Sequence, residues 1–138
     1  MATTFVDTNV LVYAYDRDQA EKHDRATEVI TELWDERLGV VSTQVLQEFY
    51  VTVTRKLPRP LSRTDARAVV NTLRHWPVQP VDADDIVEAS ELEQRHRLSF
   101  WDALIITAAK RSGAERLLTE DLQHGRHIAG LVIENPFR

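Results

Sequence analysis

The chain has 138 residues, of which 43% are hydrophobic, and this suits one compact domain spanning residues 1–138. It contains no cysteine, which excludes disulfides, a thiolate zinc site and a cysteine nucleophile. The 17 Lys and Arg against 22 Asp and Glu give a net charge of −5, which argues against a nucleic-acid partner when distribution is ignored. The longest apolar run, residues 103–109, is far shorter than the ~20 residues that cross a bilayer, and no secretory signal is visible. We therefore expect a cytoplasmic protein with no membrane contact.

Apolar periodicity and capping residues predict strands and helices that alternate along the chain. Strands are expected at residues 5–6, 40–41, 78–81, 117–119 and 131–133. Helices are expected at residues 10–13, from about Ala26 to a stop at Gly39, from Ser42 or Thr43 to Leu57, from Ser62 to about Trp76, from Asp82 to His96, and from Ser99 to Lys110. The alternation predicts an α/β fold of three layers, with a central, mostly parallel sheet between helices.

The first strand runs directly into Asp7, Thr8 and Asn9. Ligands of open parallel sheets bind outside the carboxyl ends of the strands, so this acid lies where chemistry is usually done. We expect Thr8 or Asn9 to cap the following helix through a side-chain oxygen. Turn and cap chemistry is the commoner explanation of an isolated Asp-Thr-Asn. A functional role for Asp7 therefore depends on other acids reaching the same edge of the sheet.

Three further acids are placed to do so. Glu48 lies at the edge of the apolar face of its helix, although exposed helical Glu is common. Asp102 begins the most apolar helix, either as a functional acid or as the partner of Ser99 in a capping box. Asp121 follows a buried strand as Asp7 does, and its neighbour Glu120 is the competing choice.

Together these acids indicate a metal site. Buried like charges repel one another, so a cluster of carboxylates needs protonation or a cation. Oxygen ligands favour Mg²⁺ or Mn²⁺, and magnesium is commonly held by one or two carboxylates plus a substrate phosphate. The chemistry to expect is phosphodiester hydrolysis by a metal-activated water, with Asp7 and Asp102 as direct ligands and with Glu48 and Asp121 binding directly or through water.

Four segments of the chain resemble the PIN-domain ribonucleases and, within them, the small VapC-type toxins of bacterial toxin-antitoxin pairs. They are FVDTNVL (residues 5–11), STQVLQEF (42–49), LSFWDALI (98–105) and LLTEDL (117–122), and they follow the family's order. The resemblance implies a PIN-like fold and metal-dependent endonucleolytic cleavage of RNA, which inhibits translation and growth. It assigns the acid roles to Asp7, Glu48, Asp102 and Asp121, with Thr8, Asn9 and Thr119 in support. It also implies a homodimer and a cognate antitoxin.

A local group of basic residues relieves the conflict between an acidic chain and an RNA substrate. Arg55, Lys56, Arg59 and Arg63 could hold the RNA backbone away from the acids, although solvated helix ends have the same composition. Trp101, next to Asp102, suits either a place in the core or an interface, as Trp residues usually do, or base stacking.

Two other functions remain open. The acidic groove could belong to a catalytically weak or inactive binding module that grips an antitoxin or another protein through a partner Arg. Phosphoryl transfer through an aspartyl phosphate at Asp7 is disfavoured, because Asn9 stands where many such phosphatases place a second Asp.

Overall fold

A six-stranded sheet runs through the centre of the computed structural model, which describes residues 2–138. Its strand order is β3-β2-β1-β4-β6-β5, and all neighbouring pairs are parallel except β5 with β6. The strands are β1 (Thr4–Val6), β2 (Gly39–Ser42), β3 (Val78–Gln79), β4 (Arg116–Leu118), β5 (His127–Ile128) and β6 (Leu131–Glu134). The helices are α1 (Thr8–Tyr13), α2 (Ala20–Glu36), α3 (Thr43–Arg55), α4 (Arg63–Leu73), α5 (Ala83–His96) and α6 (Phe100–Arg111).

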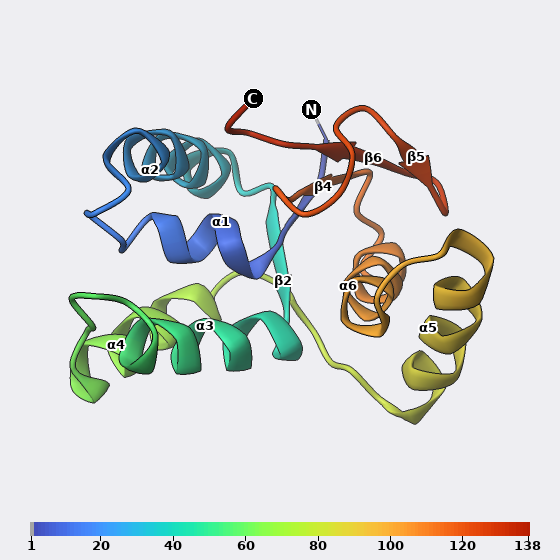
Figure 1. Cartoon of the computed structure of the whole chain (residues 1–138), viewed down its shortest axis with the longest axis horizontal. Coiled ribbons are helices and arrows are strands. Elements are labelled where there is room, and N and C mark those ends of the chain that lie inside the picture. Colours follow the sequence, from blue (N-terminus) through green and yellow to red (C-terminus); the bar gives the residue numbers. More distant parts are fainter. Residues whose placement is uncertain (1) are drawn as a thin grey trace.

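The helices form two layers. Helices α1 to α4 lie on the left of the sheet in Figure 1, and α5 and α6 lie on its right. The prediction of a three-layer α/β fold with a mostly parallel sheet is therefore confirmed. Among residues 2–138, no helix has both the length and the apolar composition needed to cross a membrane.

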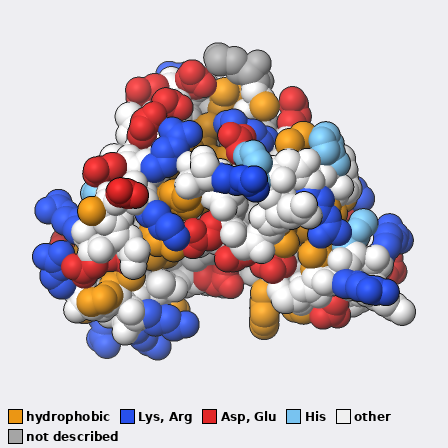
Figure 2. Space-filling view, turned by 45° about the horizontal axis from the view of Figure 1, so that its top comes forward, with side chains coloured by type: hydrophobic (Ala, Val, Ile, Leu, Met, Phe, Trp, Pro, Cys, Tyr) orange, Lys and Arg blue, Asp and Glu red, His pale blue; other side chains and the backbone are white. Residues whose placement is uncertain are grey.

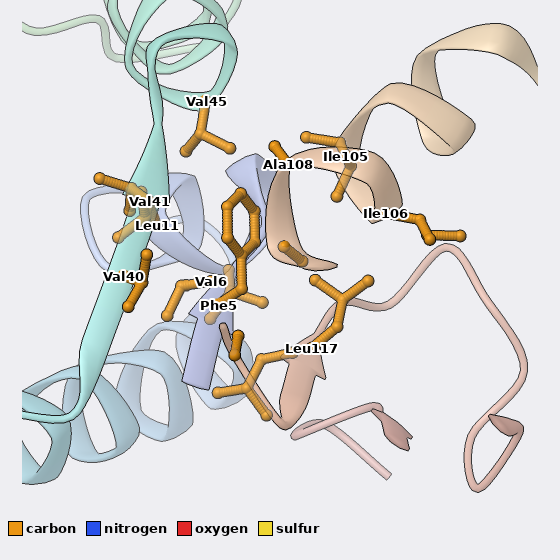
Figure 3. Packing of buried hydrophobic residues seen from close by; sticks show 14 of the residues in the cluster. Phe5, Val6, Leu11, Val40, Val41, Val45, Ile105, Ile106, Ala108 and Leu117 are labelled. Atoms are coloured by element: carbon orange, nitrogen blue, oxygen red, sulfur yellow. The ribbon is translucent and has the colours of Figure 1, made fainter. Parts of the chain in front are cut away.

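The core lies where the central strands meet both helical layers. Phe5 and Val6 of β1 are completely buried because helices cover both faces of that strand. Figure 3 shows the labelled residues of β1, β2 and β4 packed against side chains of α1, α3 and α6. The buried strand β1 therefore holds the start of α1 in a fixed position at its carboxyl end.

Side chains cap most helices as the sequence predicts. Ser42 Oγ accepts the backbone N–H of Val45 at 3.2 Å, and Ser62 Oγ accepts that of Asp65 at 3.0 Å. The helix predicted to run to about Trp76 ends at Leu73, and the strand predicted over residues 78–81 covers only Val78 and Gln79.

One local prediction is wrong, and one element was missed. Gly39 does not end a helix: α2 ends at Glu36 with Arg37 as its C-cap, whose backbone is left-handed with φ of 58°, and Gly39 begins β2. The hairpin formed by β5 and β6 was not predicted. Ala129 and Gly130 connect its strands with φ values of 52° and 83°, as the tight two-residue turns of hairpins require. The turn was not predicted because Ala129 stands at a position with positive φ, where glycine or asparagine is the usual sequence signal.

The start of α5 offers a stability test at Asp85, whose side chain is 1% exposed. Asp85 Oδ2 accepts the N–H of Asp82 at 2.9 Å, and Asp82 Oδ1 accepts the N–H of Asp85 at 3.1 Å. Arg111 forms an ion pair with Asp85, at 2.6 Å between Nε and Oδ1. The N–H of the same Nε donates its hydrogen bond to Glu88 and not to Asp85. Asp85→Ala should lower the free energy of unfolding by about 2 to 3 kcal/mol, because it removes one half of the capping box and leaves the cation without this partner. Urea unfolding followed by circular dichroism measures this change.

Asp84→Ala is the matched control, because Asp84 is exposed in the same first turn. It should cost at most about 0.5 kcal/mol, the scale of a charge near an exposed helix end. Equal losses in the two variants would show that the buried contacts of Asp85 do not stabilise the start of α5.

Candidate active site

A cavity of about 740 Å³ opens at the carboxyl end of β1. It lies between the helices that cover the two faces of the sheet, and one face of α3 lines it from Gln44 to Lys56. The four acids predicted from the sequence all line this cavity: Asp7, Glu48, Asp102 and Asp121.

Asp7 lies deepest among these acids and is 5% exposed. Its Oδ1 accepts the N–H of Thr8 at 2.7 Å, and its Oδ2 accepts the hydroxyl of Thr119 at 2.8 Å. Burial raises the pKa of Asp7 from 3.8 to about 7. The two hydrogen bonds oppose that rise, and the charges of Asp121 and Glu48 add to it. The site therefore disfavours a negative charge on Asp7 unless a positive charge is supplied.

The register of the sheet explains how Thr119 reaches Asp7. Val6 of β1 is paired with Leu118 of β4, so the next residue of each strand lies at the same edge. Thr119 Oγ1 donates to Asp7 and accepts the N–H of Asp121 at 3.1 Å. A single buried hydroxyl thus links two of the four acids.

Thr8 and Asn9 hold the side chains of Glu48 and Asp121 rather than capping α1. The N-cap of α1 is Asp7 itself, which corrects the prediction that Thr8 or Asn9 fills this position. The Thr8 hydroxyl donates to Glu48 Oε1 at 2.8 Å, and Asn9 Nδ2 donates to Asp121 Oδ2 at 2.9 Å. Consecutive residues of one turn therefore orient acids from α3 and from the turn after β4.

Asp102 enters the cavity from the first turn of α6. Ser99 caps this turn by accepting the N–H of Asp102 at 3.1 Å. Desolvation raises the pKa of Asp102, and the charges of Asp121 and Glu48 add to the rise, while a hydrogen bond with Ser99 opposes it. Asp102 therefore has two roles: its backbone N–H donates to the N-cap Ser99, and its carboxylate lines the cavity.

The neighbouring acids Glu120 and Asp121 have separate surroundings. Glu120 accepts hydrogen bonds from the Tyr13 hydroxyl and from Lys22 Nζ, the second at 2.8 Å. The Lys22 ammonium also lies 4.9 Å from the centre of the Tyr13 ring. Asp121 lines the cavity and is bound by Asn9. The structure therefore brings Asp121, and not Glu120, to the other three acids.

The four basic residues proposed to contact RNA do not gather on one surface next to the cavity. Lys56 lines the cavity, whereas Arg59 forms an ion pair with Asp18, at 2.7 Å between Nη2 and Oδ1. Arg55 and Arg63 are exposed and are not among the cavity-lining residues of the part of the chain that the structure describes. In Figure 2, acidic side chains gather at the notch between the two lower lobes, and basic side chains surround the left lobe.

Asp16 and Gln44 also line the cavity and were not predicted as part of the site, and Trp101, for which base stacking was one prediction, lines it too. Asp16 is buried, and its Oδ1 accepts the N–H of Asp18 at 3.2 Å. Gln44 is 6% exposed, and its Nε2 donates to the Trp101 carbonyl oxygen at 3.4 Å. Trp101 is 62% exposed, so it does not pack in the core. Asp16 lies in a polar break typical of a turn, and Gln44 has the type of a surface residue, so neither carried a local signal.

The residues present suit a divalent cation with part of its water shell retained. All four acids supply oxygen ligands, and a cation would relieve the repulsion that contributes to the raised pKa of Asp7. Within residues 2–138, no three acidic or imidazole side chains are positioned to enclose an ion together. Mg²⁺ does not require such a cage, because it is usually bound by one or two carboxylates, water and substrate phosphate.

Comparison with known proteins places the chain in a family. Residues 4–129 match the family model described as the PIN domain. The chain is 31% identical over 121 residues to ribonuclease VapC23 of Mycobacterium tuberculosis, which covers 85% of this chain and 91% of that protein.

Solved structures show the same fold at lower identity. The Mycobacterium tuberculosis VapC20 toxin, described as cleaving the sarcin-ricin loop, superposes with a TM-score of 0.62 at 23% identity, over 83% of this chain and 86% of that one. A toxin-antitoxin complex from Klebsiella pneumoniae gives a TM-score of 0.69 at 20% identity, over 96% and 97% of the two chains. FitAB bound to a DNA fragment gives 0.72 at 17% identity, over 98% and 96%. The chain therefore belongs to the PIN-domain family and is a distant homologue of the VapC ribonuclease toxins.

Proposed function

We propose that this protein is a divalent-metal-dependent endoribonuclease that hydrolyses phosphodiester bonds of RNA and acts as the toxin of a toxin-antitoxin pair. One observation carries the proposal: Asp7, Glu48, Asp102 and Asp121 line a single cavity although they come from distant parts of the sequence. Homology to VapC ribonucleases supports the same reaction class. We propose the cytoplasm as the location of this activity.

In this proposal Asp7 and Asp102 would hold Mg²⁺ or Mn²⁺ directly, and Glu48 and Asp121 would hold it directly or through water. When bound, the cation lowers the pKa of water and stabilises negative charge that develops on the phosphate. The protein supplies orientation. Thr8 and Thr119 fix the carboxylate of Asp7 through its two oxygens, and Asn9 fixes that of Asp121. These bonds hold the acids in place before substrate arrives, so little reorganisation is needed during the reaction.

An antitoxin and a second copy of the chain are the proposed protein partners. The solved structures that share this fold include toxin-antitoxin complexes. A partner Arg placed among the carboxylates would compete with the cation and inhibit the enzyme. Light scattering of the purified protein, alone and with its co-expressed neighbouring gene product, measures both assemblies. Calorimetry with Mn²⁺ distinguishes the enzyme from a binding module, which would take up no metal.

The adjacent acids Asp121 and Glu120 provide a matched pair of variants. Asp121→Asn should lower Mn²⁺-dependent RNA cleavage by about 10- to 100-fold, the effect of disturbing a group that supports a metal site. Glu120→Gln should change the rate by no more than about threefold, because it alters a partly exposed ion pair with Lys22 outside the cavity. Initial rates on a fluorogenic RNA report both effects. Equal losses in the two variants would contradict the assignment of Asp121 alone to the site.

A further inference from the structure

We propose that the indole of Trp101 is the stacking platform for an unpaired RNA base next to the scissile phosphodiester, so that this chain selects single-stranded over double-stranded RNA. The inference rests on the proposed ribonuclease function and adds a positioning residue to the same cavity. It starts from the exposure of the side chain. Trp101 is 62% exposed, more than any other large hydrophobic side chain of residues 2–138.

The position of Trp101 is determined by its neighbours. It precedes Asp102 in the first turn of α6, and both residues line the cavity. The Phe100 ring packs against the indole in an edge-to-face arrangement, with ring centres 5.3 Å apart at 79°. The carbonyl oxygen of Trp101 accepts a hydrogen bond from Gln44 across the cavity wall. These contacts hold the backbone and one side of the aromatic pair, while most of the indole surface remains open to a ligand.

The charge of the cavity explains why stacking is needed. The acids that line it are Asp7, Asp16, Glu48, Asp102 and Asp121. Among the lining residues that the structure describes, the one basic side chain is Lys56. Electrostatic attraction supplies most of the nonspecific affinity of ordinary RNA-binding surfaces, and this cavity provides little of it. Stacking of a base on an aromatic ring does not require a positive surface, and it tolerates any sequence because every base has a flat face.

Stacking also determines the class of RNA. In a duplex both faces of each internal base are covered by neighbouring bases, and only the edges and the backbone are accessible. A base must be unpaired and turned out before it can lie on an indole. The indole of Trp101, next to Asp102, would therefore hold a single-stranded segment at the cavity with its phosphate directed toward the acids.

Binding to protein in which cleavage is blocked tests the inference. The Asp7→Asn background prevents cleavage, and fluorescence anisotropy measures the affinity for labelled oligoadenosine and for the same strand paired with oligouridine. Trp101→Leu should weaken binding of the single strand by about 5- to 100-fold, the range for loss of one stacked base, and should leave the duplex unaffected. Trp101→Phe should stay within about threefold, because an aromatic face remains. Trp34→Leu is the control, because Trp34 is 38% exposed and lies outside the cavity.

Salt dependence separates stacking from phosphate binding. Trp101→Leu should leave the slope of log affinity against log salt unchanged, whereas Lys56→Ala should reduce it by about one. The proposal is overturned if single strand and duplex weaken equally, if Phe fails as Leu does, or if neither RNA binds. It is also overturned if Trp101→Leu changes the mass of the assembly in light scattering but not RNA affinity, because the indole then belongs to a protein interface.

Failure of the proposed function has a different signature. The parent protein would then show no Mn²⁺-dependent cleavage of the single strand, even though Trp101 still discriminated between the two RNAs in binding. Cleavage of single strand and duplex at equal rates by the parent protein and by Trp101→Leu would instead leave the ribonuclease intact and remove the stacking platform.

Discussion

The Asp7→Asn protein should lose at least about 100-fold of its Mn²⁺-dependent RNA cleavage, the scale expected for removing a charged group that stabilises the transition state. Asparagine preserves the shape of the side chain and an oxygen that accepts the N–H of Thr8, so the cap of α1 remains. Initial rates with excess Mn²⁺ measure the loss, and Asp102→Asn should behave in the same way. Full activity in both variants would remove the proposed mechanism.

The same substitution should make the protein more stable above pH 7 when EDTA is present. The pKa of Asp7 is raised from 3.8 in an unfolded chain to about 7 in the folded one, so the folded protein keeps a proton that the unfolded chain releases. This contribution to stability is complete below pH 3.8 and is lost as the pH rises through about 7. Asparagine has no such proton. The two proteins should be about equally stable below pH 3.8, and the advantage of the variant should grow by about 3 kcal/mol between pH 5 and pH 8.

Urea unfolding at the two pH values, with and without Mn²⁺, tests this linkage. Added Mn²⁺ should raise the unfolding midpoint of the parent protein at pH 8 and have little effect on Asp7→Asn, because the cation binds only the folded parent. Parallel pH profiles for the two proteins would show that Asp7 is not destabilised by its surroundings.

Gly39→Ala should lower the free energy of unfolding by about 3 kcal/mol, because a side chain there overfills a packed core. A Cβ at Gly39 would lie 2.5 Å from Cε2 of Trp76, and two more indole ring carbons would lie within 2.7 Å. Trp76 is 6% exposed and packs against Trp34 with ring centres 5.8 Å apart, so the indole has little freedom to move. Urea unfolding followed by circular dichroism measures the loss.

A double-mutant cycle with Trp76→Leu isolates the cause. In that background Gly39→Ala should cost less than about 1 kcal/mol, because the smaller side chain leaves room for the new methyl group. The same cost in both backgrounds would show that the backbone freedom of Gly39, and not its contact with the indole, is what β2 requires.

Local patterns were sufficient for the architecture. Phe5 and Val6 form a buried strand because two apolar, β-prone residues stand between polar segments, and Ser42, Ser62 and Asp82 cap helices because their side chains satisfy free N–H groups. These effects act over a few residues, so residue type and spacing reveal them. The α/β fold follows from the alternation of the elements.

Local patterns failed where packing decided the outcome. Gly39 is a residue type that often ends a helix, but it pairs with Thr4 of β1 and lies against Trp76 as the first residue of β2. Ala129 lacks the usual signature of a hairpin turn, but pairing of β5 with β6 holds it at positive φ. Thr8 is a good capping residue, but Asp7 takes the cap and Thr8 donates to Glu48.

The sequence by itself determined that Asp7 and the pair Glu120-Asp121 lie at one edge of the sheet, because each follows a strand and the carboxyl ends of parallel strands meet there. Only the tertiary structure decided how those acids are held. Thr119 donates to Asp7 across 112 positions of sequence, and Asn9 selects Asp121 while Lys22 and Tyr13 take Glu120. The raised pKa of Asp7 likewise comes from burial and from charges that distant segments bring to it. Hydrogen bonding, desolvation and charge repulsion act through space over a few ångströms. The pairing of β1 with β4 brings Asp7 and Thr119 within that distance, although they are far apart in the sequence.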